Sequence, residues 1–196
     1  VGAESLKVLL SMSQTRTADV PLAADQKVWE IGRRIPAPER VAEARERIKG
    51  PVTHKDWVWA KETLLLDALI AKKRDVEVEV QAIQVGPVVC LSNPAEYFVS
   101  YGLQLKKRSG FPMTFPVELA NGCVGYVPDE EAFGPNGGGY ETRLTSYSNL
   151  DITAGTQFMN VGLELAAKMK PAKLPERPNG PAGKPWAYGD QPPQLK

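Results

Sequence analysis

The sequence predicts an α/β fold, in which helices pack against a layered mixed sheet. Segments with strand-like alternation and segments with helical periodicity follow one another along the chain, the order typical of α/β and α+β layer structures. The chain has 196 residues, of which 42% are apolar and 24% are charged. This length and composition indicate a globular protein with one core of ordinary size and, at most, a short tail.

The first fifty residues predict three segments. In residues 5–15 an apolar run gives way to polar alternation, which predicts a strand. Residues 19–38 predict a connector with interrupted helical character. Residues 38–51 predict a short helix that Gly50-Pro51 ends, with one apolar face made of Val41, Ala44 and Ile48.

Residues 53–73 contain the clearest helical pattern in the chain. Thr53 suits the N-cap, and Asp56 stands three residues later, as in a capping box. Helical spacing predicts a stripe of core-facing residues: Trp57, Leu64, Leu65, Ala68 and Leu69.

Two strands are predicted next. Residues 75–85 alternate apolar with polar or charged side chains, which is typical of a half-buried strand. Gly86-Pro87 forms a turn, and residues 88–92 are a short, fully apolar strand. Cys90, in this strand, and Cys123, in a later apolar strand-like run, are both expected to be buried free thiols.

The stretch SNPAEYF, residues 92–98, gives Glu96 two possible roles. Asn93 is a good N-cap, Pro94 suits the first helical position, and Glu96 at the third position can bond back to the cap. This local pattern predicts a helix from residue 93 to 109 and favours capping over metal ligation for Glu96.

The last part of the chain alternates between short elements and loops. Residues 113–120 and 123–127 predict two strand pieces, and residues 128–143 predict a long glycine-rich loop. Residues 151–170 predict an amphipathic helix. From Pro171 onward the chain carries seven of its 17 prolines and few apolar residues, so an extended arm or a disordered end is expected there.

Several kinds of function are excluded or disfavoured. A net charge of +1 gives no electrostatic case for binding nucleic acid. No apolar run approaches the roughly 20 residues of a transmembrane helix. The glycine-rich stretch lacks the lysine of a phosphate-binding loop. Because His54 is the only histidine, this chain cannot build a histidine-based zinc site by itself.

Four motifs in one order carry a resemblance to a known family. VEVQAIQVG precedes the short apolar strand, and NPAEYF follows it. KKRSGFPMTFPVELANGCVGYVPDEEAF and then GGYETRLTSYSNL lead to the last helix. From about Asp75 to Lys170 the chain thereby resembles the C-terminal half of the catalytic domain of the neutral/alkaline non-lysosomal ceramidases, most closely the bacterial members. Residues 1–170 are then expected to be the C-terminal portion of such a domain, and residues 171–196 its proline-rich tail.

The resemblance implies a layered α/β fold and hydrolysis of an N-acyl amide at one zinc ion, which two histidines, a glutamate and a tyrosine hold. Glu96, in Pro94-Ala95-Glu96, matches the glutamate ligand of the family's Pro-Gly-Glu turn. Tyr126, after Ala120-Asn121, matches the tyrosine ligand. Tyr140 and Glu141 match a pair that lines the catalytic site.

The same resemblance implies a partner. The family's two histidines belong to the N-terminal half of the domain, and His54 matches neither. A second polypeptide with that half is therefore expected, together with an N-acyl amide or lipid-like substrate. An extracellular or periplasmic location, which includes association with the cell surface, is also implied. The start at Val1 without a methionine predicts a processed, trimmed or partial product.

Two functions remain open at this point. The chain is either part of a zinc-dependent amidohydrolase or a non-catalytic structural or assembly subunit with the same fold. Alanine in place of glycine at residue 95 favours the subunit, whereas retention of Glu96, Tyr126 and Tyr140-Glu141 favours the hydrolase.

Three structural expectations follow. The chain alone is not expected to be an autonomous domain, because half a domain leaves an apolar face uncovered. The oxygens of Glu96 and Tyr126 are expected within roughly 4 Å of each other, as shared zinc ligation requires. The loop at residues 128–141, made mobile by its glycines, is expected to border the substrate entrance.

Overall fold

The computed structural model of the chain describes residues 1–11 and 19–174. The chain divides into two compact units, one of Val20–Lys173 and one of Val1–Asp19 with Leu174–Lys196. The smaller unit contains helix α1, Gly2–Ser11. The strand predicted at residues 5–15 is therefore wrong up to Ser11, because alanine, leucine, glutamate and lysine in this segment favour a helix. The rest of that strand and the predicted tail from residue 175 lie outside the described residues.

The larger unit is built on a four-stranded mixed sheet with the order β1-β2-β3-β5. These strands are Leu22–Gly32, Asp75–Val85, Val88–Ser92 and Met113–Val117. β2 is antiparallel to both β1 and β3, and β3 is parallel to β5. The predicted α/β class, a mixed sheet with packed helices, is confirmed.

β1 corrects the sequence-based prediction of a connector at residues 19–38. All eleven of its residues pair with β2, from Leu22 opposite Val85 to Gly32 opposite Asp75. Trp29 and Ile31 alternate inward, and Ile31 is buried. The polar run Asp25-Gln26-Lys27 and the exposed Val28 hide the alternation in the sequence, so pairing with β2 decides the strand.

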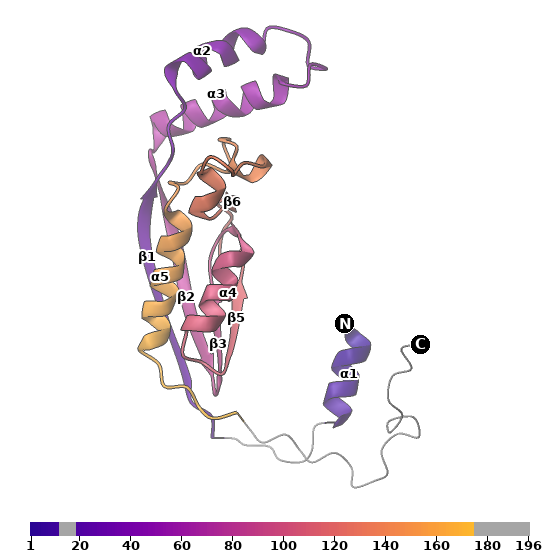
Figure 1. The fold of residues 1–196 in the computed structure, drawn as a ribbon, viewed down its shortest axis with the longest axis vertical. Helices are drawn as coiled ribbons and strands as arrows, with labels where there is room; N and C mark the ends of the chain where they lie inside the picture. The colour runs from indigo at the N-terminus through magenta and orange to yellow at the C-terminus, as the bar shows by residue number, and fades with distance from the viewer. Residues whose placement is uncertain (12–18, 175–196) are drawn as a thin grey trace. The chain divides into compact units, whose positions relative to one another are not determined.

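Two helices cover one face of this sheet: α4, Val99–Arg108, and α5, Ala154–Ala167 (Figure 1). The core lies between them and the alternate strand residues that point toward them, which include Val78, Val80, Val89 and Leu91. Gly155 is required where α5 meets α4, since a Cβ there would lie 2.3 Å from the Tyr101 ring.

α2, Pro38–Arg47, and α3, Trp57–Lys72, form a hairpin at one end of the unit (Figure 1). Val41 and Ala44 are buried as predicted. The predicted stripe on α3 is wrong: the buried residues are Ala60, Thr63 and Leu66, while Leu65 is 45% exposed. The helix packs on α2 with a different face because it also meets the polar loop of residues 142–150.

The α3 start is also corrected. Residues 53–56 form turns. The N-cap is Asp56, three residues later than the predicted Thr53, and it makes no side-chain capping bond.

Residues 93–98 are not the first turns of a helix. Glu96–Tyr97 form the short strand β4, which pairs in parallel with β6, Tyr126–Val127. The Asn93 side chain accepts a hydrogen bond from the Ala95 N–H at 3.0 Å, and α4 begins only at Val99. The capping role of Glu96 is therefore wrong, because its backbone N–H bonds to the Gly125 carbonyl in the strand pair.

The glycine-rich loop contains two short 3₁₀ helices, η1 at Glu130–Phe133 and η2 at Tyr140–Thr142. Within residues 1–11 and 19–174, no helix has the length and apolar character to cross a membrane.

Candidate functional site

Glu96 and Tyr126 stand directly opposite each other in the β4–β6 pair. Paired residues of neighbouring strands point to the same face of a sheet, so both side chains project together. Both are half-buried. The register is held by hydrogen bonds from Glu96 N–H to the Gly125 carbonyl, 3.0 Å, and from Phe98 N–H to the Val127 carbonyl, 3.3 Å.

The Tyr126 hydroxyl lies between Tyr140 and Glu96. The Tyr140 hydroxyl donates to it at 3.5 Å, and the two rings meet edge to face with centroids 5.2 Å apart. Tyr140 and Glu96 beside the Tyr126 hydroxyl raise the pKa of this phenol, and the negative charge of the Glu96 carboxylate disfavours a second negative charge next to it. The structure thus brings three of the four predicted site residues together.

The backbone on both sides of Tyr126 is tightly constrained. Gly125 is buried with φ +76°, and a Cβ there would lie 1.6 Å from the Tyr147 carbonyl oxygen. The Tyr126 N–H donates to the Ser148 hydroxyl at 3.0 Å, and the Ser148 N–H donates to the Thr145 hydroxyl at 3.0 Å. Ser148 is 1% exposed, so this polar contact fixes Tyr126 from behind.

Arg34 fastens this segment to the end of β1. Its guanidinium donates to three carbonyl oxygens, those of Thr142, Ser148 and Leu150, at 2.9–3.1 Å. It also stacks on the Phe133 ring, 4.8 Å from the centroid. Burial lowers the pKa of Arg34, and the carbonyls that it binds compensate the buried charge. The sequence analysis missed Arg34, because its acceptors are more than a hundred residues away and leave no local signal.

Glu141, the fourth predicted residue, is placed differently. No hydrogen bond or ion pair joins it to Glu96, Tyr126 or Tyr140 in the part of the chain that the structure describes. Its carboxylate folds back, with one oxygen 2.6 Å from the position of a Cβ on Gly139. His54 lies in the turns before α3, where its Nδ1 accepts from the Asp56 N–H at 3.2 Å.

The donor set fits part of a zinc site. A carboxylate and a phenol are oxygen ligands that zinc accepts, and the positive charge of a metal would offset the neighbours that keep Tyr126 neutral. Among residues 1–11 and 19–174, no group of three or more His, Cys, Asp or Glu side chains could hold a metal ion. Two oxygens are half of a tetrahedral zinc site, so zinc bound between Glu96 and Tyr126 would need further ligands.

Comparisons with known proteins gave structural matches only. No family model matches the sequence, and no curated protein matches it. A structure of a ceramidase complexed with C2 matches 51% of this chain and 17% of its own chain, with 16% identity and a TM-score of 0.39. The crystal structure of neutral ceramidase from Pseudomonas aeruginosa matches 80% of this chain and 30% of its own, with 12% identity and a TM-score of 0.41. The chain thus spans less than a third of the length of either protein.

Proposed function

We propose that this chain is part of a zinc-dependent amidohydrolase that cleaves an N-acyl amide, with the remaining metal ligands on a second polypeptide. The observation that supports this proposal best is the register of β4 and β6. It places the carboxylate of Glu96 and the phenol of Tyr126 side by side, in hydrogen-bonding contact. The family motifs name these same two residues as ligands.

Each side chain has a distinct role in this proposal. Glu96 supplies the negative charge that balances the metal, and Tyr126 supplies the second oxygen. Tyr140 orients the Tyr126 phenol through its hydroxyl, and Glu141 lines the substrate side of the loop. Zinc held there would supply Lewis-acid chemistry, which activates water and polarises the scissile carbonyl. The substrate is then an N-acyl amide of lipid-like character, met outside the cell or in the periplasm.

A second candidate function is a non-catalytic structural or assembly subunit. Tyr126, Glu96 and Tyr140 satisfy one another's hydrogen-bonding groups without any metal, which is the specific observation in its favour. The raised pKa keeps Tyr126 a neutral phenol, the state suited to such a polar cluster.

The test measures metal content by elemental analysis and hydrolysis of a fluorogenic N-acyl substrate, both on the assembly of this chain with its partner. Glu96→Gln keeps an oxygen but removes its charge, so metal and activity are expected to fall together while the fold survives. Glu43→Gln, an exposed glutamate of α2 outside this loop, is the matched control and is expected to change neither. Unchanged metal content and unchanged activity in Glu96→Gln would show that Glu96 is not a metal ligand. An assembly without metal and without hydrolysis would favour the structural subunit.

A further inference from the structure

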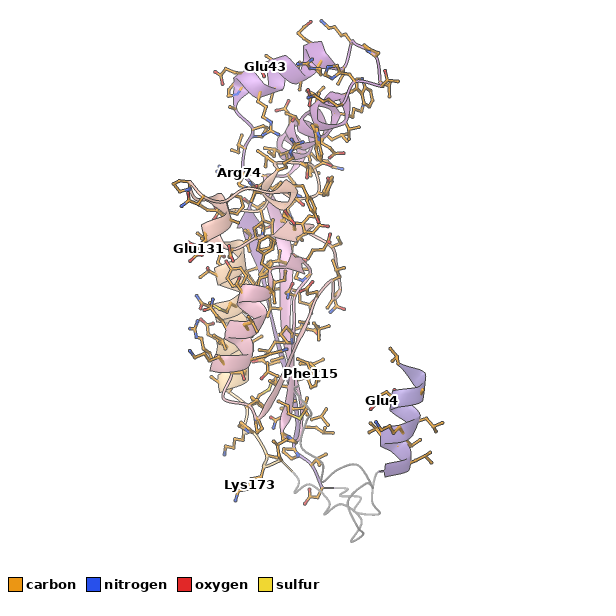
Figure 2. All side chains as sticks on the ribbon, turned by 45° about the vertical axis from the view of Figure 1, so that its right-hand side comes forward. Glu4, Glu43, Arg74, Phe115, Glu131 and Lys173 are labelled. Atoms are coloured by element: carbon orange, nitrogen blue, oxygen red, sulfur yellow. The ribbon has the colours of Figure 1, made fainter. Side chains whose placement is uncertain are left out.

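Within the unit Val20–Lys173, one face of the four-stranded sheet carries no helix. α4 and α5 both pack on the opposite face, and the strand residues that alternate with the core residues point to the open side (Figure 1). Phe115 is one of them (Figure 2). Its neighbour Thr114 is buried, whereas Phe115 is 47% exposed. We call this side the open face.

Half of the open face is apolar. The strand register aligns its side chains in rows that cross all four strands. One row is Leu22, Val85, Val88 and Met113, and the next is Ala24, Ile83, Cys90 and Phe115. Leu22 is 72% exposed, Val85 51% and Ile83 44%. Contiguous apolar rows of this kind on a protein surface mark a site of interaction.

The other half of the open face, which we call the acidic half, begins with a mixed row of Gln26, Gln81, Ser92 and Val117 and then carries three glutamates beside the exposed Val28. Glu30 of β1 stands directly opposite Glu77 of β2, and Glu79 follows two residues later on the same side. Like charges directly opposite each other destabilise a strand pair. Lys73 offsets Glu30 through an ion pair at 3.0 Å, but within residues 1–11 and 19–174 no lysine or arginine pairs with Glu77.

We propose that the open face binds a second polypeptide, with apolar side chains against the apolar half and lysine or arginine against Glu30, Glu77 and Glu79. Two sheets stacked face to face, about 10 Å apart, would bury the apolar rows. Basic side chains at the acidic end would relieve the repulsion between Glu30 and Glu77 and fix the orientation of the partner.

A second copy of this chain fits the open face less well. The residues that strands β1, β2, β3 and β5 direct to this side include no lysine or arginine. A face-to-face pair of copies could therefore cover the apolar rows, but these strands would add no positive charge, and the Lys73 of each copy is already paired with its own Glu30.

This inference shares the second polypeptide with the proposed function, but it does not depend on zinc. If the second polypeptide binds the open face but the assembly has no metal and no hydrolytic activity, the open-face interface stands and the hydrolase function is wrong. If the assembly holds metal and hydrolyses the substrate but does not use the open face, the hydrolase function stands and the open-face interface is wrong.

The first experiment identifies what lies on the open face in the cell. Benzoylphenylalanine replaces Phe115, and in a control chain it replaces Leu65, which is similarly exposed on α3. After irradiation of cells that naturally make the chain, mass spectrometry identifies the linked peptides. The expected result is one polypeptide linked at position 115, through a peptide with an apolar strand and nearby lysine or arginine, and no such product from position 65.

The second experiment measures binding of that polypeptide to the purified chain. Ile83→Asp puts a charge into the apolar half, and Glu77→Lys with Glu79→Lys reverses the acidic half. Each is expected to weaken binding by about tenfold or more, or roughly 1.4 kcal/mol. Binding of the unchanged chain is expected to weaken with added salt. Val58→Asp, at an exposed position on α3, is the control and should bind normally. Circular dichroism melts confirm that each variant is folded, and Phe115→Asp replaces Ile83→Asp if that variant does not fold.

Four outcomes would overturn the proposal. They are cross-links only to this chain, cross-links to many unrelated proteins, no cross-link at position 115 at all, and normal binding by both the Ile83 and the Glu77/Glu79 variants.

Discussion

Tyr126 is held by three separate contacts. The three are with Tyr140 and Glu96 at its hydroxyl and with Ser148 at its backbone N–H. In addition, residue 125 before it must be glycine. Since each contact comes from a different segment, a change in any one of them should alter the position or the titration of the phenol before it alters the fold.

The titration of Tyr126 gives the most direct test of its contacts. Glu96→Gln removes the negative charge beside the phenol, so it is expected to lower the pKa of Tyr126 toward the ordinary value of about 10. The folded-state pKa lies above that of the unfolded chain, so the stabilisation from these contacts is present below about pH 10 and is lost as the pH rises through the folded-state pKa. NMR of ¹³Cζ-labelled tyrosine measures the pKa. A Tyr126 pKa that is unchanged in Glu96→Gln would contradict the contact between the phenol and this carboxylate.

Alanine substitutions at Gly125 and Gly110 separate two costs to stability: strain of a left-handed backbone and steric overlap of the new Cβ. Both have a left-handed backbone, with φ of +76° and +77°, but a Cβ at Gly110 meets no atom within 4 Å. Gly110→Ala is therefore expected to cost only the backbone strain, about 1 kcal/mol. Gly125→Ala adds the overlap with the Tyr147 carbonyl, for a total of about 2–4 kcal/mol. Urea denaturation measures both. Equal losses would mean that the 145–148 segment moves aside freely.

At the scale of elements, the glycine-rich loop has defined turns. The Gly138 N–H bonds to the Ala132 carbonyl at 2.8 Å, which closes the end of η1 and leads the chain toward Tyr140. Gly138 and Gly139 have φ of +128° and +97°, which favour glycine at both positions. The position of this loop at a substrate entrance stays a prediction.

Two alanine substitutions test whether the loop positions Tyr140. A Cβ on Gly137 would lie 2.2 Å from the Ala132 carbonyl oxygen, so Gly137→Ala is expected to open the turn and separate Tyr140 from Tyr126. A Cβ on Gly134 would lie 3.1 Å from the Glu131 carbonyl oxygen, and the φ of Gly134 is an ordinary −78°. Gly134→Ala is therefore the milder control. Loss of the Tyr140–Tyr126 nuclear Overhauser contacts in the Gly137 variant alone is the expected result. Contacts retained in both variants would show that the turn does not place Tyr140.

For the whole molecule, the open face determines how the chain behaves alone. Exposed apolar rows should bind the dye anilinonaphthalene sulfonate and promote self-association. Ile83→Lys with Phe115→Lys is expected to reduce dye fluorescence and association, with a change in unfolding free energy within about 0.5 kcal/mol because both side chains are already exposed. Fluorescence titration and sedimentation velocity measure the two effects. A compact wild-type monomer that binds no dye and melts cooperatively would contradict the predicted dependence on a partner.

The sequence by itself determined those elements whose own periodicity matches their burial. β2 alternates because one face meets α5 and the other is open, and α5 has apolar residues on the side that meets the sheet. β3 and β5 were likewise predictable, because each is a short, mainly apolar run next to turn residues. Gly86-Pro87 marks the turn before β3.

Only the tertiary structure decided the rest. β1 exists because β2 pairs with its full length, and the segment after Asn93 became a strand because Gly125 and Val127 accept its backbone hydrogen bonds. The family motifs named Glu96 and Tyr126, but two-residue strands are too short for any alternation, so their direct opposition could not be predicted locally. Arg34 left no sequence signal for the same physical reason: its partners are backbone carbonyls, which every residue carries, and only folding brings them to it.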